Sequence, residues 1–126
     1  MNNEPCYICG KYVTEIHHII KKSQNKQLQH CKLNLIPLCP FHHRDHKNGV
    51  HHNKELNHQI KLLFQNRLEL LFNKDYLTRE DIKEVLKIKD KPLYNLLKVL
   101  RQYPEGYKRE DVIRACMGGR MITDDK

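Results

Sequence analysis

The sequence predicts an α+β fold in which a small core of two strands and one short helix precedes an all-α region. The first 53 residues hold four of the five cysteines and eight of the nine histidines, together with short apolar runs. From residue 54 onward, apolar side chains recur at helical spacing instead, and turn signals are few. A chain of 126 residues has room for only one modest core, so a bound metal would help to stabilise it.

The first half contains signals for two strands and a helix. Residues 11–20 alternate β-branched, aromatic and polar side chains, which predicts a strand. Residues 21–32 are polar and rich in lysine, and they predict a loop. The apolar run 35–38 predicts a second strand, which Pro37 restricts to an edge or an end. A short helix is expected over residues 40–47.

The second half is predicted to consist of four helices. The first covers residues 53–72, and the second opens with Thr78 as N-cap, followed three residues later by Asp81 in a pattern that resembles a capping box. The third begins at Asp90, and the last covers residues 109–117.

The predicted elements group into three segments. We expect a metal-stapled core over 1–53, a connecting helix over 54–73 and a helical C-terminal region over 74–126. Within the last segment, residues 77–100 resemble a helix-turn-helix, whose second helix would enter the major groove of DNA. The alternative is a plain helical hairpin packed on the core. Both interpretations remain open at this point.

Charge and hydropathy narrow the class of protein. The formal net charge of +8 and the pI near 9.3 favour an anionic partner, with nucleic acid as the first candidate. No apolar run reaches the length that spans a bilayer, and the N-terminus is too polar for a signal peptide. We therefore expect a cytoplasmic protein without a membrane partner, located in the bacterial host if a phage encodes it. Cysteines in a reducing compartment indicate metal ligands or buried thiols.

Two short motifs predict a structural zinc site. Cys6-x-x-Cys9 and Cys39-x-x-His42 lie about thirty residues apart and together supply four sulfur and nitrogen ligands for a closed tetrahedral Zn²⁺. The other two cysteines lie outside this pattern and are expected to be ordinary thiols. A redox role for the CxxC motif is excluded because no βαβ context surrounds it.

A zinc staple does not account for the remaining histidines. His17 and His18 are adjacent on a predicted strand, where neighbouring side chains point to opposite faces. One of them could therefore bind a metal while the other reaches a substrate. His43, His46 and His51 follow shortly after the second metal-binding motif.

This arrangement resembles the HNH endonucleases. The stretches CYIC, EIHHI and NLIPLCPFHH are similar in order and spacing to the family pattern of CxxC, (D/H)HI, an Asn and LCxxCH, over about residues 6–53. The resemblance implies a ββα-metal core that hydrolyses DNA phosphodiester bonds with one divalent ion. The chain departs from the pattern at His42, where cysteine is more common, and at Lys21, where proline is common.

The resemblance also implies roles for individual residues. His17 would bind the catalytic metal, and His18 would be the general base that activates water. Asn34 would orient the loop that holds this base. His43, nine positions after the asparagine, would be a second ligand of the catalytic metal.

The last ligand of the catalytic metal is less well defined by the resemblance. Between His46 and His51 we prefer His51. Imidazole ligands accept Mg²⁺ less readily than Mn²⁺, Ni²⁺ or Zn²⁺, because Mg²⁺ prefers oxygen. We therefore expect relaxed metal use that includes Mn²⁺.

The stretch around the histidine pair is basic. No acidic residue occurs between Glu15 and Asp45. This stretch suits contact with DNA phosphates, and the candidate side chains are Lys21, Lys22, Lys26, Lys32 and Arg44. The alternative is a lysine-rich loop that is simply solvated.

The leading interpretation is a DNA endonuclease that nicks or cuts both strands, in a phage or a mobile element. The alternative is a non-catalytic, zinc-stapled nucleic-acid-binding protein, which would need the zinc ligands but would have no use for His18. A homodimer would suit double-strand cleavage by one small active site per chain, and the oligomeric state stays open.

Overall fold

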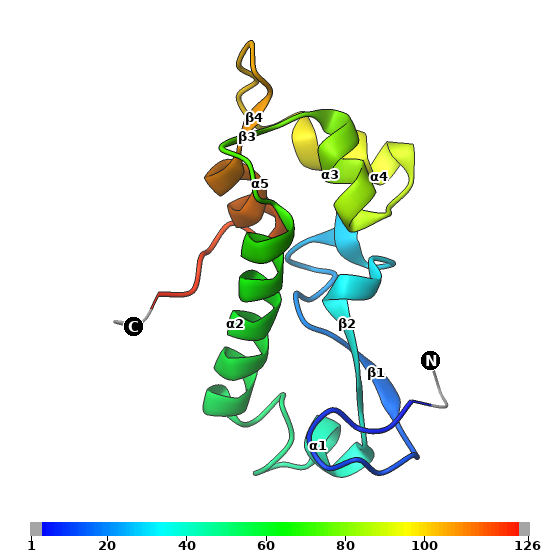
Figure 1. The fold of residues 1–126 in the computed structure, drawn as a ribbon. Helices are drawn as coiled ribbons and strands as arrows, with labels where there is room; N and C mark the ends of the chain where they lie inside the picture. The colour runs from blue at the N-terminus through cyan, green and yellow to red at the C-terminus, as the bar shows by residue number, and fades with distance from the viewer. Residues whose placement is uncertain (1–3, 124–126) are drawn as a thin grey trace.

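The computed structural model describes residues 4–123, which form a mixed α+β structure (Figure 1). Within these residues, five α-helices accompany two small two-stranded sheets. In chain order the elements are β1 (Glu15–His18), the 3₁₀ turns η1 (Lys26–Leu28) and η2 (Lys32–Asn34), β2 (Leu35–Leu38), α1 (Pro40–Arg44), α2 (Lys54–Leu71), β3 (Tyr76–Leu77), α3 (Arg79–Leu86), α4 (Asp90–Leu97), β4 (Tyr107–Lys108) and α5 (Arg109–Cys116).

Strands β1 and β2 form an antiparallel pair in which His17 lies opposite Ile36. Strand β1 is shorter than the strand predicted over residues 11–20. Before it, the chain is bent in a tight turn, where the Cys6 N–H donates to the Lys11 carbonyl at 2.7 Å. After His18, the chain leaves the β1–β2 pair and enters the lysine-rich loop of residues 21–32. The pairing therefore covers only four residues per strand.

Helix α1 is one turn long and ends at Arg44, short of the expected residue 47. The cause is Asp45, whose carboxylate accepts the backbone N–H groups of Lys47 and Asn48 at 3.1 and 3.0 Å. An aspartate that bonds to the backbone two and three residues ahead favours a turn over continued helix. The chain consequently reverses before α2 begins.

Helix α2 is the longest element, and it lies within one residue of the predicted 53–72 at each end. Its N-cap is Asn53, whose side chain accepts the Leu56 N–H at 3.1 Å. In Figure 1 the helix stands to the left of the β1–β2 pair, and its buried side chains join the same apolar cluster as those of β2. None of the helices in residues 4–123 has the length and apolar character needed to cross a membrane.

A single cluster of buried apolar side chains extends through all three predicted segments. It includes Ile19, Leu28, Phe64, Leu86, Leu93 and Val112. Polar contacts also connect the two halves, because the Asn25 amide donates to the carbonyls of Ala115 and Cys116 at 2.9 and 3.2 Å. The core, the long helix and the C-terminal helices therefore pack on one another.

Helices α3 and α4 are joined by three residues, of which Lys87 adopts the left-handed conformation at φ 52°. The predicted capping box is confirmed, since Thr78 and Asp81 each accept the other's backbone N–H. The inner faces of both helices join the core, and α4 packs against η1. Tyr94 and Lys98 nevertheless remain exposed on the outer face of this hairpin.

The expectation of an all-α C-terminal region is wrong in one respect. Strands β3 and β4 pair antiparallel, with Leu77 opposite Tyr107, and so bring together the two ends of the α3–α4 segment. Gly106 makes the close approach feasible. It adopts φ +126°, and a Cβ placed there would lie 2.4 Å from the Leu77 carbonyl oxygen. Each strand has only two residues, which is too short to produce a periodic signal.

We expect Gly106→Ala to lower the free energy of unfolding by about 3 kcal/mol or more, because it adds a backbone clash to an unfavourable φ. Gly119→Ala is the matched control, since Gly119 also has a positive φ but nothing within 4 Å of an added Cβ. Its cost should be about 1–2 kcal/mol. Urea denaturation measures both, and equal destabilisation would contradict the role assigned to the β3–β4 contact.

Candidate functional site

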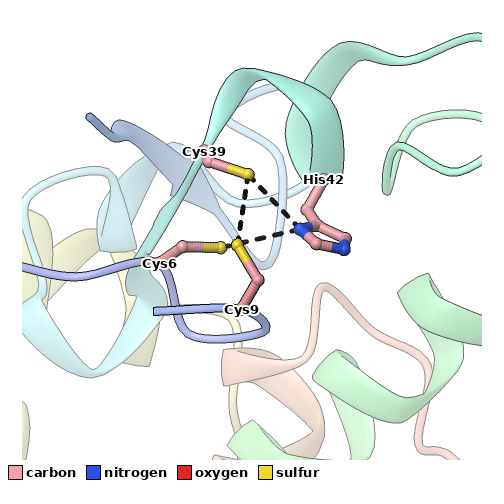
Figure 2. Close-up of side chains that lie close together, drawn as sticks. All are labelled: Cys6, Cys9, Cys39 and His42. Atoms are coloured by element: carbon pink, nitrogen blue, oxygen red, sulfur yellow. Dashed lines mark hydrogen bonds between the residues drawn. The ribbon is translucent and has the colours of Figure 1, made fainter. Parts of the chain in front are cut away.

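Three cysteines and one histidine gather at the end of the molecule that contains α1 (Figure 2). The Sγ atoms of Cys6, Cys9 and Cys39 and one ring nitrogen of His42 all lie within 4.8 Å of one another. The Cys9 and Cys39 sulfurs are 3.6 Å apart, and Nδ1 of His42 is 3.3 Å from Cys39 and 3.8 Å from Cys6. The four residues therefore lie close enough to bind a metal ion such as zinc.

The spacing of these atoms agrees with a tetrahedral metal site. With Zn–S bonds of about 2.3 Å and Zn–N bonds of about 2.0 Å, ligand atoms are separated by roughly 3.5–3.8 Å. One of the cysteines, Cys6, also has a local reason to ionise. Burial raises the pKa of Cys6, but backbone N–H groups of Cys39, Cys9 and Ile8 outweigh this effect and hold it at about 6. A thiolate is the form in which cysteine binds metals.

Local backbone structure places the four ligands. The first two follow one another in a tight turn closed by a hydrogen bond from the Gly10 N–H to the Cys6 carbonyl at 2.9 Å. The Tyr7 N–H donates to the Pro37 carbonyl at 2.9 Å, which fixes this turn on β2. Cys39 is the N-cap of α1, so His42 falls on the first turn of that helix, facing the same point.

The remaining two cysteines do not take part in this cluster. Burial raises the pKa of both Cys31 and Cys116, so both favour the neutral thiol. The Cys31 thiol donates to the Leu86 carbonyl at 3.3 Å, and both side chains belong to the apolar core. These two residues are ordinary buried thiols, as expected.

A second cluster consists of three histidines. One ring nitrogen from each of His17, His43 and His51 lies within 4.8 Å of the other two. The Nε2 atoms of His43 and His51 are 3.1 Å apart. His17 comes from β1, His43 from α1 and His51 from the turn before α2, so residues 34 positions apart meet at one point. Imidazole nitrogens grouped in this way are suitable ligands for a divalent transition metal.

His17 provides an independent indication of a metal site. Only 4% of this residue is exposed, and its Nε2 has no hydrogen-bond partner among the described residues. Burial and the neighbouring imidazoles of His43 and His51 lower its pKa to about 3, so the ring is neutral at physiological pH. A buried nitrogen without a partner is costly unless something else satisfies it. A metal ion fits, because it needs an imidazole that is neutral and has a free lone pair.

Glu15 supports this cluster. It lies two residues before His17 on β1, so both side chains point to the same face of the strand. Its carboxylate accepts from Nδ1 of His43 at 2.7 Å and from the Arg44 guanidinium at 2.7 Å. Because Nδ1 donates, the Nε2 lone pair of His43 faces the other two histidines. A carboxylate behind a ligand histidine fixes its tautomer and raises its basicity. No role for Glu15 follows from the sequence pattern alone.

The structure brings His51, and not His46, to His17 and His43. His46 instead lies against His52, with ring centroids 5.3 Å apart. The cause is the turn after α1, where Gly49 passes so close to Asp45 that an added Cβ would lie 2.5 Å from its backbone nitrogen. This tight reversal returns His51 towards α1. His51 is therefore the histidine that lies with His17 and His43, and its role as a metal ligand stays a prediction.

His18, the next residue on β1, is held by the basic loop. Its Nε2 lies 3.0 Å from the Gln29 carbonyl oxygen. A carbonyl can only accept, so Nε2 carries the proton and the neutral ring keeps a free lone pair on Nδ1. The residue is half-buried, in contrast to buried His17, as expected for adjacent positions on a strand.

Asn34 ties the loop that contains Gln29 to the end of β1. This residue is fully buried, and its side-chain oxygen accepts the Ile20 N–H at 2.8 Å. Its amide nitrogen donates to the carbonyls of Ile20 and Leu28 at 3.1 Å each. Leu28 directly precedes Gln29, so Asn34 fixes the carbonyl that holds His18. The orienting role expected of Asn34 stays a prediction.

The five basic residues expected to contact phosphate have different surroundings. The charge of Lys21 is among the causes that lower the pKa of His17 and His51. Arg44 forms the ion pair with Glu15 and so belongs to the histidine cluster. The remaining three are exposed on the loop between β1 and β2, with no ion pair among residues 4–123: Lys22, Lys26 and Lys32.

Comparison with known proteins does not assign the chain to a family. No family model, curated protein or solved structure matches it. Any functional assignment must therefore rest on the residues of this chain and their geometry.

We expect Cys39→Ser to abolish zinc binding and to unfold the β1–β2 region, because a small core relies on its metal staple. Cys31→Ser is the matched control, since it replaces a buried thiol outside the cluster. Zinc content by atomic emission and secondary structure by circular dichroism measure the two effects. A folded Cys39→Ser protein with no zinc would contradict the structural role of the site.

We expect Glu15→Gln to weaken binding of Mn²⁺ or Ni²⁺ at the histidine cluster by about 10–100-fold, because His43 loses its charged partner. Glu84→Gln on the exposed surface of α3 is the control. Calorimetric titration of zinc-loaded protein measures both affinities. Unchanged affinity in Glu15→Gln would mean that the carboxylate does not support a metal ligand.

Proposed function

We propose that this protein is a metal-dependent DNA endonuclease of the HNH type, a hydrolase that acts on phosphodiester bonds. One observation carries the proposal. The buried, unpartnered Nε2 of His17 meets His43 and His51, while the next residue of the strand, His18, keeps a free Nδ1. A candidate metal ligand and a candidate general base are thus adjacent residues of β1.

We further propose that the cluster of Cys6, Cys9, Cys39 and His42 holds a structural Zn²⁺ and that the histidine cluster holds the catalytic ion. The first cluster offers four ligands and is therefore closed, as structural zinc sites are. The second offers only three nitrogens, which leaves coordination positions for substrate. Its imidazole donors favour Mn²⁺, Ni²⁺ or Zn²⁺ over Mg²⁺.

The residues around the histidine cluster would divide the work of hydrolysis. A divalent ion, when bound there, would polarise the scissile phosphate and stabilise the leaving 3′ oxygen. Neutral His17 would keep its lone pair available, and Glu15 would hold His43 in the matching tautomer. Lys21 would add positive charge beside the phosphate.

His18 would activate the attacking water. Nδ1 accepts a proton from the water as its oxygen forms a bond to phosphorus, and the 3′ oxygen leaves from the opposite side. The ring is then an imidazolium, which the Gln29 carbonyl stabilises through the Nε2–H bond. An imidazole suits this role because its ordinary pKa lies near physiological pH.

DNA is the proposed partner because the surroundings of the histidine cluster are basic. No acidic residue occurs between Glu15 and Asp45, and Glu15 itself is engaged by His43 and Arg44. A surface of this kind attracts the phosphate backbone. A non-catalytic DNA-binding protein would share this surface, but it would have no use for His18.

We expect the zinc-loaded protein with Mn²⁺ to convert supercoiled plasmid to nicked or linear DNA. His18→Ala should lower the rate by at least about a hundredfold, because general-base catalysis typically contributes 10²–10⁴-fold. Zinc content and DNA affinity should stay unchanged. His46→Ala is the matched control, because this neighbouring histidine lies outside the cluster.

The outcomes separate the two candidate functions. Cleavage by the wild type and by His46→Ala, but not by His18→Ala, would support the nuclease. Full cleavage by His18→Ala would contradict the role of His18 as base. If the wild type binds DNA but does not cleave it with Mg²⁺, Mn²⁺, Ni²⁺ or Zn²⁺, the non-catalytic alternative is favoured.

A further inference from the structure

Three cations from distant parts of the chain come close to one another. Lys61 lies on α2, Arg120 on the C-terminal tail and Lys21 on the loop after β1. Lys21 and Arg120 are the cations whose charge helps to lower the pKa of Lys61. Lys21 also follows His18, the last residue of β1, by three positions, so it lies close to the end of the strand that carries His17.

The path of the C-terminal tail explains how Arg120 reaches this place. Gly118 passes against the side chains of Ile20 and Gln24, which a Cβ would approach to 3.2 and 3.3 Å. Further on, the buried side chain of Gln65 binds both backbone groups of Ile122, at 2.7 and 3.0 Å. The tail is thus attached at both sides of Arg120.

The attachment points also place Lys61 next to the tail. Gln65 lies one helical turn after Lys61, so both side chains are on the same face of α2. The tail runs beside this helix after leaving α5 (Figure 1). Arg120 is therefore held near Lys61 by hydrogen bonds that do not involve either charge.

This grouping of like charges is unfavourable in the protein alone. Lys61 is half-buried, and burial together with Lys21 and Arg120 lowers its pKa. None of these three cations has an ion pair within residues 4–123, whereas several surface cations do, among them Arg79, Lys83 and Arg114. Cations held together without a partner form a site for an anion.

We propose that Lys61 and Arg120, together with Lys21, bind the DNA backbone phosphates next to the scissile one. The proposal rests on the proposed function, because it names the substrate contacts of the same site. Lysine supplies a compact charge, and arginine can bind a phosphate through two N–H groups. Both residues lie outside the basic stretch between β1 and β2, so α2 and the tail extend the DNA-binding surface.

A purely structural role for the two cations predicts a different outcome. If Lys61 stabilised the fold, its removal would lower the melting temperature. If it serves phosphate binding, its removal relieves repulsion and desolvation. Burial and the charges of Lys21 and Arg120 lower the pKa of Lys61, so the charged form is disfavoured in the folded protein, and an uncharged side chain removes this cost.

The experiment measures duplex DNA binding and thermal stability in the zinc-loaded full chain. Fluorescence anisotropy with a labelled duplex, over a series of salt concentrations and without added Mn²⁺, gives the affinity and its salt dependence. We expect Lys61→Met and Arg120→Gln each to weaken binding about tenfold and to reduce the salt slope by about one. The melting temperature of Lys61→Met should be unchanged or higher.

Two controls test whether position matters as well as charge. Arg67→Gln removes an exposed cation from the same helix and should leave the salt slope unchanged. Lys61→Arg keeps the charge and should retain binding. Three results would overturn the proposal. The first is wild-type affinity in both Lys61→Met and Arg120→Gln, and the second is a loss of binding that is accompanied by a lower melting temperature of the variant. The third is a wild-type protein that does not bind DNA.

Cleavage assays keep this proposal separate from the nuclease proposal. If the wild type binds DNA without cutting it, and Lys61→Met still weakens binding, the phosphate contacts stand and hydrolysis fails. If the wild type cuts DNA and both variants bind as tightly as it does, hydrolysis stands and the phosphate contacts fail.

Discussion

Antiparallel pairing of β1 with β2 is the interaction on which both side-chain clusters depend. Strand β1 carries Glu15, His17 and His18, and β2 leads directly into Cys39 and α1. Two strands of four residues are too short to be stable alone. Their ends are therefore fixed by other means. The tight turn of Cys6 and Cys9 is bonded to Pro37 at one end, and at the other the buried side chain of Asn34 binds the chain after β1.

Helix α1 connects the two clusters mechanically. His42 and His43 are consecutive on one helical turn, yet the first lies with the cysteines and the second with the histidines. A helix of five residues has little stability by itself, so its orientation depends on what its side chains bind. A metal ion held by Cys39 and His42 would therefore also fix His43. Glu15 acts on the same point from β1, because its carboxylate binds both His43 and Arg44.

Much of this arrangement could be predicted from local sequence, and the rest depends on tertiary contacts. Ligand spacing predicted the cysteine and histidine cluster, and the capping box at Thr78 was predicted from its own four residues. The role of Glu15 was missed because its partner His43 lies 28 positions away, and only the strand register brings them together. The β3–β4 pair was missed since two-residue strands carry no period. For the helix-turn-helix resemblance, the structure shows a packed hairpin with exposed Tyr94 and Lys98, and DNA reading stays a prediction.

Two parts of the described chain, the histidine cluster and the neighbouring cations, carry unfavourable interactions. A buried Nε2 without a partner on His17, three imidazoles in contact and like charges at Lys61 and Arg120 each cost folding free energy. Other polar groups of the described chain follow the usual rules. Asn34 and Gln65 are buried with their hydrogen bonds made, and Arg79, Lys83 and Arg114 on the surface have ion pairs. Under the proposed function, the imidazoles around His17 and the cations at Lys61 and Arg120 are sites for ligands that are not part of the chain. A divalent cation would satisfy the first group and a phosphate the second, and a DNA strand with a metal ion at its scissile bond supplies both together.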